Sequence, residues 1–159
     1  MTQPILVGTN GRRFAGFAAA VLVFVIDADR RVLLLKAPGR RRGWEIVNGG
    51  LEAGETLLEG VAREVAEEAG AGLRMRVLGT VHAMTFHYDD AIPHMISSFF
   101  VAEYLGGDVE PGDDMAGSEV RWATLDEVRE FFDAGQAMVP QELWLFERAL
   151  QCFDLWRRD

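Results

Sequence analysis

Residues 49–71, GGLEAGETLLEGVAREVAEEAGA, constrain the fold of this chain most strongly, because they join a glycine-rich turn to a helix with a defined start and end. Thr56 and Glu59 have the T-x-x-E spacing of a capping box, in which the two residues satisfy each other's backbone N–H groups. Gly70 is a residue type that favours the end of a helix. The sequence therefore predicts a helix over residues 57–69.

The predicted helix has two different faces. Apolar residues recur at i, i+3, i+4, i+7 and i+11, which predicts a core-facing stripe formed by Leu58, Val61, Ala62, Val65 and Ala69. A second arc carries three carboxylates at i, i+3 and i+4, those of Glu64, Glu67 and Glu68. Gly60 falls in the same arc one turn earlier, which predicts a gap without a side chain on the acidic face.

Three like charges on one arc of a helix repel one another by about 0.2 to 0.5 kcal/mol per pair, and Arg63 is the basic residue among them. The alternative is that these glutamates only solvate an outer face of the helix. A helix used for that purpose would alternate positive and negative side chains. Carboxylate oxygens are the ligands that Mg²⁺ and Mn²⁺ prefer, commonly with substrate phosphates in the same coordination shell. The arc therefore predicts a site for a metal ion and a phosphate.

Composition limits the class of function. A chain of 159 residues with 49% hydrophobic content can bury the core of one domain, which we expect to span residues 1–159. A net charge of -9 disfavours a nucleic acid polymer as partner, because such binding needs a basic surface. The single Cys152 excludes a disulfide within the chain, and the apolar run over residues 14–26 is too short to span a bilayer. The sequence also has no signal-type start. We therefore expect a soluble cytoplasmic protein with no membrane partner.

The rest of the chain predicts a sheet with further helices. Apolar runs over residues 17–26 and 31–36 flank a turn and predict a hairpin of buried strands. Further extended segments are predicted over residues 44–47, 73–84, 95–104 and 119–122, and helices over residues 125–134 and 140–156. Residues 1–13 show little pattern and are expected to cross the surface.

Three loops offer candidate binding residues. Arg40 and Arg42 lie in a basic loop, residues 37–43, which is either a solvated turn or a site that steers phosphate. Trp44, Phe86 and Tyr88 are aromatic candidates for stacking on a nucleotide base, although packing within the protein is an equally common use. The third loop, residues 106–117, is rich in acidic residues that are candidate metal ligands or bases.

Residues 49–71 resemble the signature of the Nudix hydrolase family, G-x5-E-x7-R-E-U-x-E-E-x-G-U, in which U is an aliphatic residue. Eight positions match at the required spacing: Gly49, Glu55, Arg63, Glu64, Val65, Glu67, Glu68 and Gly70. Ala71 departs from the last position, and Asn48 stands where similar proteins often have proline. The order of elements is also similar, so the resemblance implies an α/β/α sandwich with a mixed β-sheet over nearly the whole chain.

The resemblance implies a metal-dependent hydrolase that cleaves a pyrophosphate bond in a nucleoside diphosphate linked to another group. Nucleoside triphosphates, dinucleoside polyphosphates, ADP-ribose and nucleotide sugars are the candidate substrates. The implied cofactor is Mg²⁺, with Mn²⁺ as an alternative, and the implied partner is a small-molecule nucleotide, with a homodimer as one possible assembly. The alternative is a nucleotide-binding or regulatory module that has lost turnover, which the intact set of acids disfavours.

The resemblance also implies roles for individual residues. The implied metal ligands are Glu64, Glu67, Glu68, the Gly49 carbonyl and, as an additional ligand, Glu119, with Asp113 or Asp114 as its replacement. Glu64 is the first choice as general base, and Glu55 and Arg63 are expected to orient the other acids. Tyr88, seventeen residues beyond Ala71, resembles a marker of diadenosine polyphosphate hydrolases, whereas the proline that marks ADP-ribose hydrolases is absent.

Overall fold

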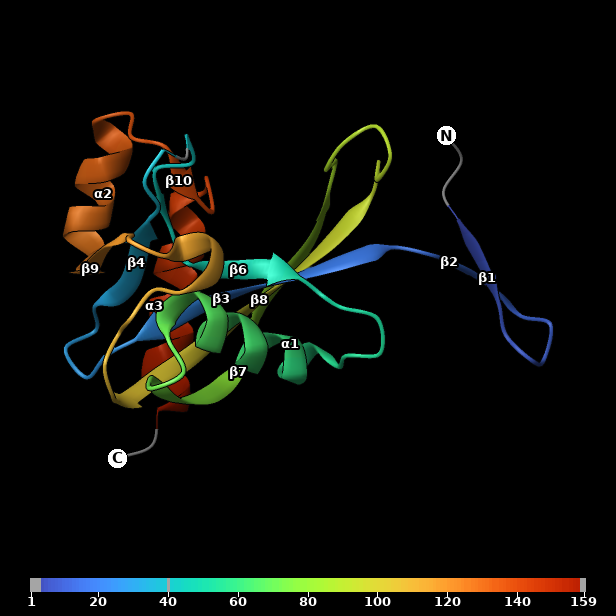
Figure 1. The fold of residues 1–159 in the computed structure, drawn as a ribbon, viewed down its shortest axis with the longest axis horizontal. Helices are drawn as coiled ribbons and strands as arrows, with labels where there is room; N and C mark the ends of the chain where they lie inside the picture. The colour runs from blue at the N-terminus through green and yellow to red at the C-terminus, as the bar shows by residue number, and fades with distance from the viewer. Residues whose placement is uncertain (1–3, 40, 158–159) are drawn as a thin grey trace.

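The computed structural model describes residues 4–39 and 41–157, and its main feature is a mixed β-sheet with helices on both faces (Figure 1). The described part of this sheet has eight strands, in the order β10-β5-β4-β3-β8-β7, with β6 paired to β3 and β9 paired to β4. The strands are β3 (Ala18–Ile26), β4 (Val32–Lys36), β5 (Trp44–Glu45), β6 (Val47–Gly50), β7 (Arg74–Phe86), β8 (Met95–Gly106), β9 (Glu119–Ala123) and β10 (Met138–Val139). The pairs β3/β8 and β10/β5 are parallel and the others are antiparallel.

Strand β3 lies in the middle of the sheet and is buried on both faces. Side chains alternate between the two faces of a strand. Between residues 21 and 26, the even-numbered side chains join the core cluster under α2 (Leu125–Asp133) and α3 (Leu143–Trp156), and the odd-numbered ones join the cluster under α1 (Leu57–Glu64). A continuous apolar run is therefore what this strand requires. The predicted α/β fold with a mixed sheet between helical layers is confirmed.

The predicted hairpin of the first two buried strands is correct only at its turn. Strands β3 and β4 pair at Ile26 and Val32 and then separate. Beyond the turn, β6 pairs with β3 and β9 pairs with β4, so each strand gains a partner that is distant in the sequence. Local turn residues predict the reversal of the chain, but they do not predict which strand lies beside it afterwards.

Two other expectations for the ends of the chain are wrong. Residues 4–16 form a second, two-stranded sheet of β1 (Ile5–Val7) and β2 (Arg13–Ala15), where residues 1–13 were expected to cross the surface before the first strand. The last helix begins at Leu143 instead of Pro140, because Met138 and Val139 pair with β5 as strand β10 and the chain turns after them. Strands of two or three residues are too short for a periodic signal.

The start of α2 gives a prediction for stability. Thr124 and Glu127 form a complete capping box, and Arg121 donates a hydrogen bond of 2.7 Å to Glu127 Oε1. The bonds from Arg121 and from the backbone N–H of Thr124 lower the pKa of Glu127 from 4.5 to about 2. A carboxyl group with a lowered folded pKa stabilises the fold above its unfolded pKa, and this contribution is lost as the pH falls toward 2.

We expect Glu127→Gln to lower the free energy of unfolding by about 1 kcal/mol at pH 7. The difference from the parent protein should shrink between pH 4.5 and pH 2, where Glu127 becomes protonated in the folded state. Urea denaturation at several pH values measures both effects. Glu130→Gln, an exposed glutamate of the same helix, is the matched control, and a pH-independent difference for Glu127→Gln would contradict the prediction.

Candidate active site

The acidic helix starts and ends as its sequence predicts. The Thr56 side chain accepts a hydrogen bond from the Glu59 N–H, and the Glu59 carboxylate accepts one of 2.8 Å from the Thr56 N–H, which completes the capping box. Helix α1 continues into η1 (Val65–Ala69), a π-helical turn that ends at Gly70 with φ of 108°. The π-helical turn sets Glu67 and Glu68 on a wider spiral than an α-helix would.

The predicted apolar stripe is wrong at two positions, because the helix is rotated toward its acidic arc. Leu58 is 57% exposed and Ala62 is also exposed, whereas Glu64 and Glu68 are each only 6% exposed. Carboxylates tolerate such burial when other groups pair with them. The predicted gap at Gly60 is filled by the Leu51 side chain, which would lie 2.3 Å from a Cβ atom at that position.

Arg63 joins three of the predicted acids into one group, which we call the Arg63 cluster: Arg63, Glu55, Glu64 and Glu67. The guanidinium binds both oxygens of Glu55, at 2.6 Å through Nε and at 3.1 Å through Nη2. Its Nη1 lies 2.8 Å from Glu64 Oε1 and 2.8 Å from Glu67 Oε2. Nη2 also donates to the Gly50 carbonyl at 2.8 Å, which ties the cluster to the end of β6. Charge-assisted bonds of this kind fix orientation as well as supplying energy.

Glu64 lies directly above the backbone of Gly49. A Cβ atom on Gly49 would come within 2.0 Å of Glu64 Oε1, so the carboxylate occupies the space that any larger residue would need. Burial raises the pKa of Glu64, and the bond to Arg63 opposes that shift. The spacing of the signature thus has a steric meaning in this chain: residue 49 must be glycine for the Glu64 carboxylate to lie where it does.

Glu68 is held by strand β6 through Asn48, which the sequence pattern does not place in the site. The Asn48 N–H donates to Glu68 Oε2 at 2.9 Å, and the Asn48 amide donates to Ile46 O at 2.8 Å and to Glu45 Oε2 at 3.1 Å. Proline at position 48 would have no N–H to donate. The departure from proline therefore adds a hydrogen bond to an acid of the helix, which the sequence pattern alone does not reveal.

The remaining candidates lie outside the Arg63 cluster. Glu119 is exposed, and its ion-pair partner among the described residues is Lys36, at 3.5 Å. The acidic loop contacts the helix through its backbone, because the Gly112 N–H donates to the Glu67 carbonyl just before η2 (Asp113–Met115), which contains both aspartates. Arg42 lies 3.7 Å from the buried Glu45 carboxylate. Arg40 lies outside the described residues.

The three aromatic candidates have different environments. Trp44 is buried, and its ring stacks on Phe131 with centroids 6.0 Å apart, so the structure places it in the core. Tyr88 is 53% exposed beyond the end of β7 and has an edge contact with Phe86. Of the three, Phe86 and Tyr88 are therefore the ones that present ring surface to solvent.

The donor set near Gly49 fits a hard divalent cation in its chemistry. Glu64, Glu67 and Glu68 supply carboxylate oxygens from one helical segment, two of them buried beside β6. Within residues 4–39 and 41–157, no three His, Cys, Asp or Glu side chains have converged into metal-binding geometry. Arg63 Nη1 donates to both the Glu64 and the Glu67 carboxylate, at 2.8 Å each.

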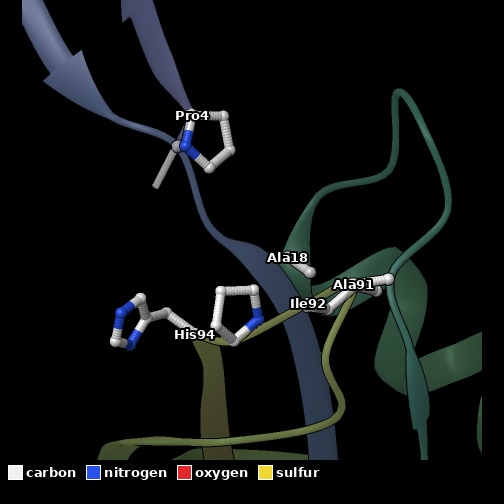
Figure 2. A pocket seen from close by; sticks show the side chains of 7 residues that line it. Pro4, Ala18, Ala91, Ile92 and His94 are labelled. Carbon is white, nitrogen blue, oxygen red and sulfur yellow. The ribbon is translucent and has the colours of Figure 1, made fainter. Parts of the chain in front are cut away.

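A small apolar pocket lies elsewhere, between the residues that flank β1 and β2, the start of β3 and the loop before β8 (Figure 2). It has a volume of about 130 Å³ and is lined by Pro4, Gly16, Ala18, Ala91, Ile92, Pro93 and His94. Its lining has no carboxylate. The acidic helix beside β6, and not this pocket, is therefore the candidate active site.

The chain is similar to known proteins in sequence. The family model described as the NUDIX domain matches residues 16–143. An ADP-ribose pyrophosphatase from Methanocaldococcus jannaschii is 33% identical over 97 residues, which are 60% of this chain and 56% of that protein. The NAD-capped RNA hydrolase NudC from Vibrio parahaemolyticus is 30% identical over 112 residues, 67% of this chain and 39% of that protein. The chain thus spans about half or less of the length of these two relatives.

The fold has counterparts among solved structures. The MutT protein from Methanosarcina mazei has a TM-score of 0.66 at 22% identity, with 85% of this chain and 94% of that chain covered. An ADP-ribose pyrophosphatase from Streptococcus suis has a TM-score of 0.64 at 17% identity, with 86% and 91% covered. The mixed sheet and its helical layers define an α/β domain with the fold of these structures. The chain belongs to the Nudix hydrolase family, as its signature predicts. The helices of the described chain are all too short or too polar to cross a bilayer.

Proposed function

We propose that this chain is a metal-dependent pyrophosphohydrolase that cleaves the pyrophosphate bond in a nucleoside diphosphate linked to another group. The observation that carries the proposal is the Arg63 cluster, in which one guanidinium binds Glu55, Glu64 and Glu67 on the signature helix. A module that only binds nucleotides has no need of this arrangement. The name of the Methanocaldococcus jannaschii relative, ADP-ribose pyrophosphatase, supports the class of bond.

In this proposal, a metal ion would be held by Glu64, Glu67 and Glu68 together with the Gly49 carbonyl, and Glu119 would be an additional ligand. Bound Mg²⁺ or Mn²⁺ would neutralise phosphate charge and lower the pKa of the attacking water. Water attacks one phosphorus, its proton passes to the Glu64 carboxylate, and the bond to the bridging oxygen breaks. Arg63 and Glu55 keep the acids oriented throughout, which makes them positioning residues.

The substrate is proposed only as a class. Nucleoside triphosphates, dinucleoside polyphosphates, ADP-ribose and nucleotide sugars all contain the required bond. Arg40 and Arg42 are proposed to bind phosphate and Tyr88 to stack on a base, whereas Trp44 is left out because its ring is buried against Phe131. We further propose that residues 1–159 form a single domain and that the single Cys152 reflects a cytoplasmic setting.

A substrate panel tests the proposal. One member of each of the four substrate classes is incubated with the full chain, with Mg²⁺, with Mn²⁺ or with EDTA, and nucleotide products are separated by ion-exchange chromatography. Products of pyrophosphate-bond cleavage that form with Mg²⁺ or Mn²⁺ and do not form with EDTA support the enzyme. If no product forms with any class while calorimetry detects nucleotide binding, the binding module is the better description.

Gly49→Ala gives a steric prediction for the same site. The new methyl group must displace the Glu64 carboxylate, which lies 2.0 Å from its position, so we expect kcat/KM to fall by at least about 100-fold. Gly50→Ala is a matched control, because a Cβ atom there meets no atom within 4 Å and the carbonyl that binds Arg63 is retained. Equal activity of the two variants would contradict the proposed position of Glu64.

A further inference from the structure

The chain changes its strand partner directly before the candidate active site. Glu45, at the end of β5, pairs with β4, whereas Val47, at the start of β6, pairs with β3. Ile46 lies between the two strands, and we call residues 45–48 the β5–β6 bend. The geometry of this bend determines the direction in which β6 continues, and therefore where the backbone groups of residues 48–50 point.

The backbone that follows the bend meets the signature helix at successive residues. The Asn48 N–H donates to the Glu68 carboxylate at 2.9 Å, and the Gly50 carbonyl accepts a hydrogen bond of 2.8 Å from the Arg63 guanidinium. Gly49, between them, leaves the space that another carboxylate of the helix occupies. A rotation of β6 would therefore disturb these contacts together.

The Asn48 side chain holds the bend. Its Nδ2 donates hydrogen bonds to the Ile46 carbonyl, at 2.8 Å, and to Glu45 Oε2, at 3.1 Å. One amide nitrogen carries two hydrogens and can make both bonds at once. Asn48 thus connects the bend to the helix, because its side chain binds Glu45 and its backbone N–H binds Glu68.

Glu45 provides a fixed acceptor inside the protein. Its exposed fraction is 0%, against 6% for Glu64 and for Glu68. Arg42 Nη1 lies 3.7 Å from the Oε2 atom that accepts from Asn48. Burial of a carboxylate is unfavourable, and an apolar residue of similar volume often gives equal or higher stability. The carboxylate is therefore better explained by what it binds than by the stability of the fold.

We propose that Glu45 is a positioning residue of the active site, which orients Glu68 and the turn at Gly49 through its bond to Asn48. This role rests on the proposed function, in which Glu68 and the Gly49 carbonyl would hold the metal ion. Groups that bind metal ligands set the orientation of those ligands, and their loss lowers metal affinity. Loss of the acceptor at Glu45 should therefore weaken metal binding more than it weakens the fold.

Binding of Mn²⁺ to the full chain without substrate is the first test, measured by electron paramagnetic resonance. Glu45→Met keeps the approximate size of the side chain but removes the acceptor, so the dissociation constant for Mn²⁺ should rise by about tenfold. Glu45→Gln keeps an acceptor oxygen for the Asn48 amide, so its dissociation constant should stay within about threefold of the parent value. Equal weakening by the two variants would overturn the proposal.

Asn48→Ala tests the other side of the same bond. It removes the amide that holds the bend and keeps the backbone N–H, and it should also raise the dissociation constant for Mn²⁺ by about tenfold. The double variant with Glu45→Met should bind Mn²⁺ as weakly as either single variant, because the two side chains act as one unit. Weakening equal to the product of the single effects would overturn the proposal. Since Asn48 is only half-buried, this variant also tests the role of Glu45 if Glu45→Met does not fold.

Asp27→Asn is the matched control for the loss of a buried carboxylate. Asp27 is 6% exposed and accepts hydrogen bonds from the N–H groups of Asp29 and Arg31 in the turn after β3. It lies about 20 Å along the strand from Val21, which pairs with Gly49. The control should unfold at a lower urea concentration than the parent protein and keep the parent dissociation constant for Mn²⁺. A rise in this constant as large as that of Glu45→Met would overturn the proposal.

Turnover provides a second readout on a substrate found in the panel. For Glu45→Met, the Mg²⁺ concentration at half-maximal activity should rise by about tenfold, whereas kcat at saturating Mg²⁺ should approach the parent value. If the parent protein binds Mn²⁺ and Glu45→Met binds it equally well, the role of Glu45 is overturned and the proposed function stands. If the parent protein binds no Mn²⁺, the proposed function is overturned, and the role of Glu45 with it.

Discussion

Glu64→Gln is expected to lower kcat by at least about 100-fold while the fold remains intact. The substitution keeps the shape of the side chain above Gly49 but removes its negative charge. A neutral amide cannot accept a proton from water and is a weaker ligand for Mg²⁺. Since burial already raises the pKa of Glu64, the loss of charge should cost little stability. Steady-state kinetics on a substrate found in the panel, together with circular dichroism, separates activity from folding.

Glu130→Gln serves again as the control, because it removes one exposed carboxylate from α2 and leaves the signature helix unchanged. Activity of Glu64→Gln within a few-fold of the parent protein would contradict the role of Glu64 as base and as ligand. A loss of activity that coincides with unfolding would be detected by circular dichroism, and Glu68→Gln then provides a second variant with the same expected kinetic loss.

The start of the signature helix could be predicted because the information is local. Thr56 and Glu59 satisfy backbone groups within one turn, so the T-x-x-E pattern determines the first helical residue wherever the helix lies. The buried strand β3 could be predicted for a similar reason, since a continuous apolar run has few other uses in a chain of this size. These features depend little on the distant parts of the chain.

The rotation of the helix could not be predicted from its apolar pattern. Its buried face is decided by groups on β6: Gly49 leaves space for the Glu64 carboxylate, and the Asn48 N–H binds Glu68. Both contacts join residues that are at least fifteen positions apart. With the carboxylates satisfied in this way, Leu58 is left in solvent. The apolar pattern alone therefore predicts more burial of Leu58 than the structure shows.

The role of Arg63 was only partly visible in the sequence. Its position one turn before Glu67 gives the i, i+4 ion pair that is observed at 2.8 Å. Its strongest contact, the paired bonds to Glu55, crosses the β6–α1 loop and has no helical spacing. The burial of Trp44 under Phe131 depends in the same way on α2, which comes much later in the chain. Contacts of this type can be predicted only when the fold is known.

Arg63→Lys is expected to cause the second large loss of activity, although it preserves the charge. The guanidinium makes five hydrogen bonds to four residues in a fixed planar geometry: Glu55, Glu64, Glu67 and Gly50. An ammonium group has three donors on a single nitrogen and cannot reach all of these acceptors. The carboxylates would then lose their common orientation, and we expect kcat to fall by about 100-fold and stability by about 2 kcal/mol.

Arg76→Lys is the matched control, because Arg76 binds Glu103 through two nitrogens at an exposed position on β7, outside the Arg63 cluster. Surface pairs of this kind contribute little, so stability should change by less than about 1 kcal/mol and activity should be retained. A double-mutant cycle of Arg63→Lys with Glu55→Gln adds a readout that general destabilisation would not move. Since the two side chains act as one unit, their effects on kcat should be strongly non-additive. Additive effects, or full activity of Arg63→Lys, would show that the acids are oriented without the guanidinium.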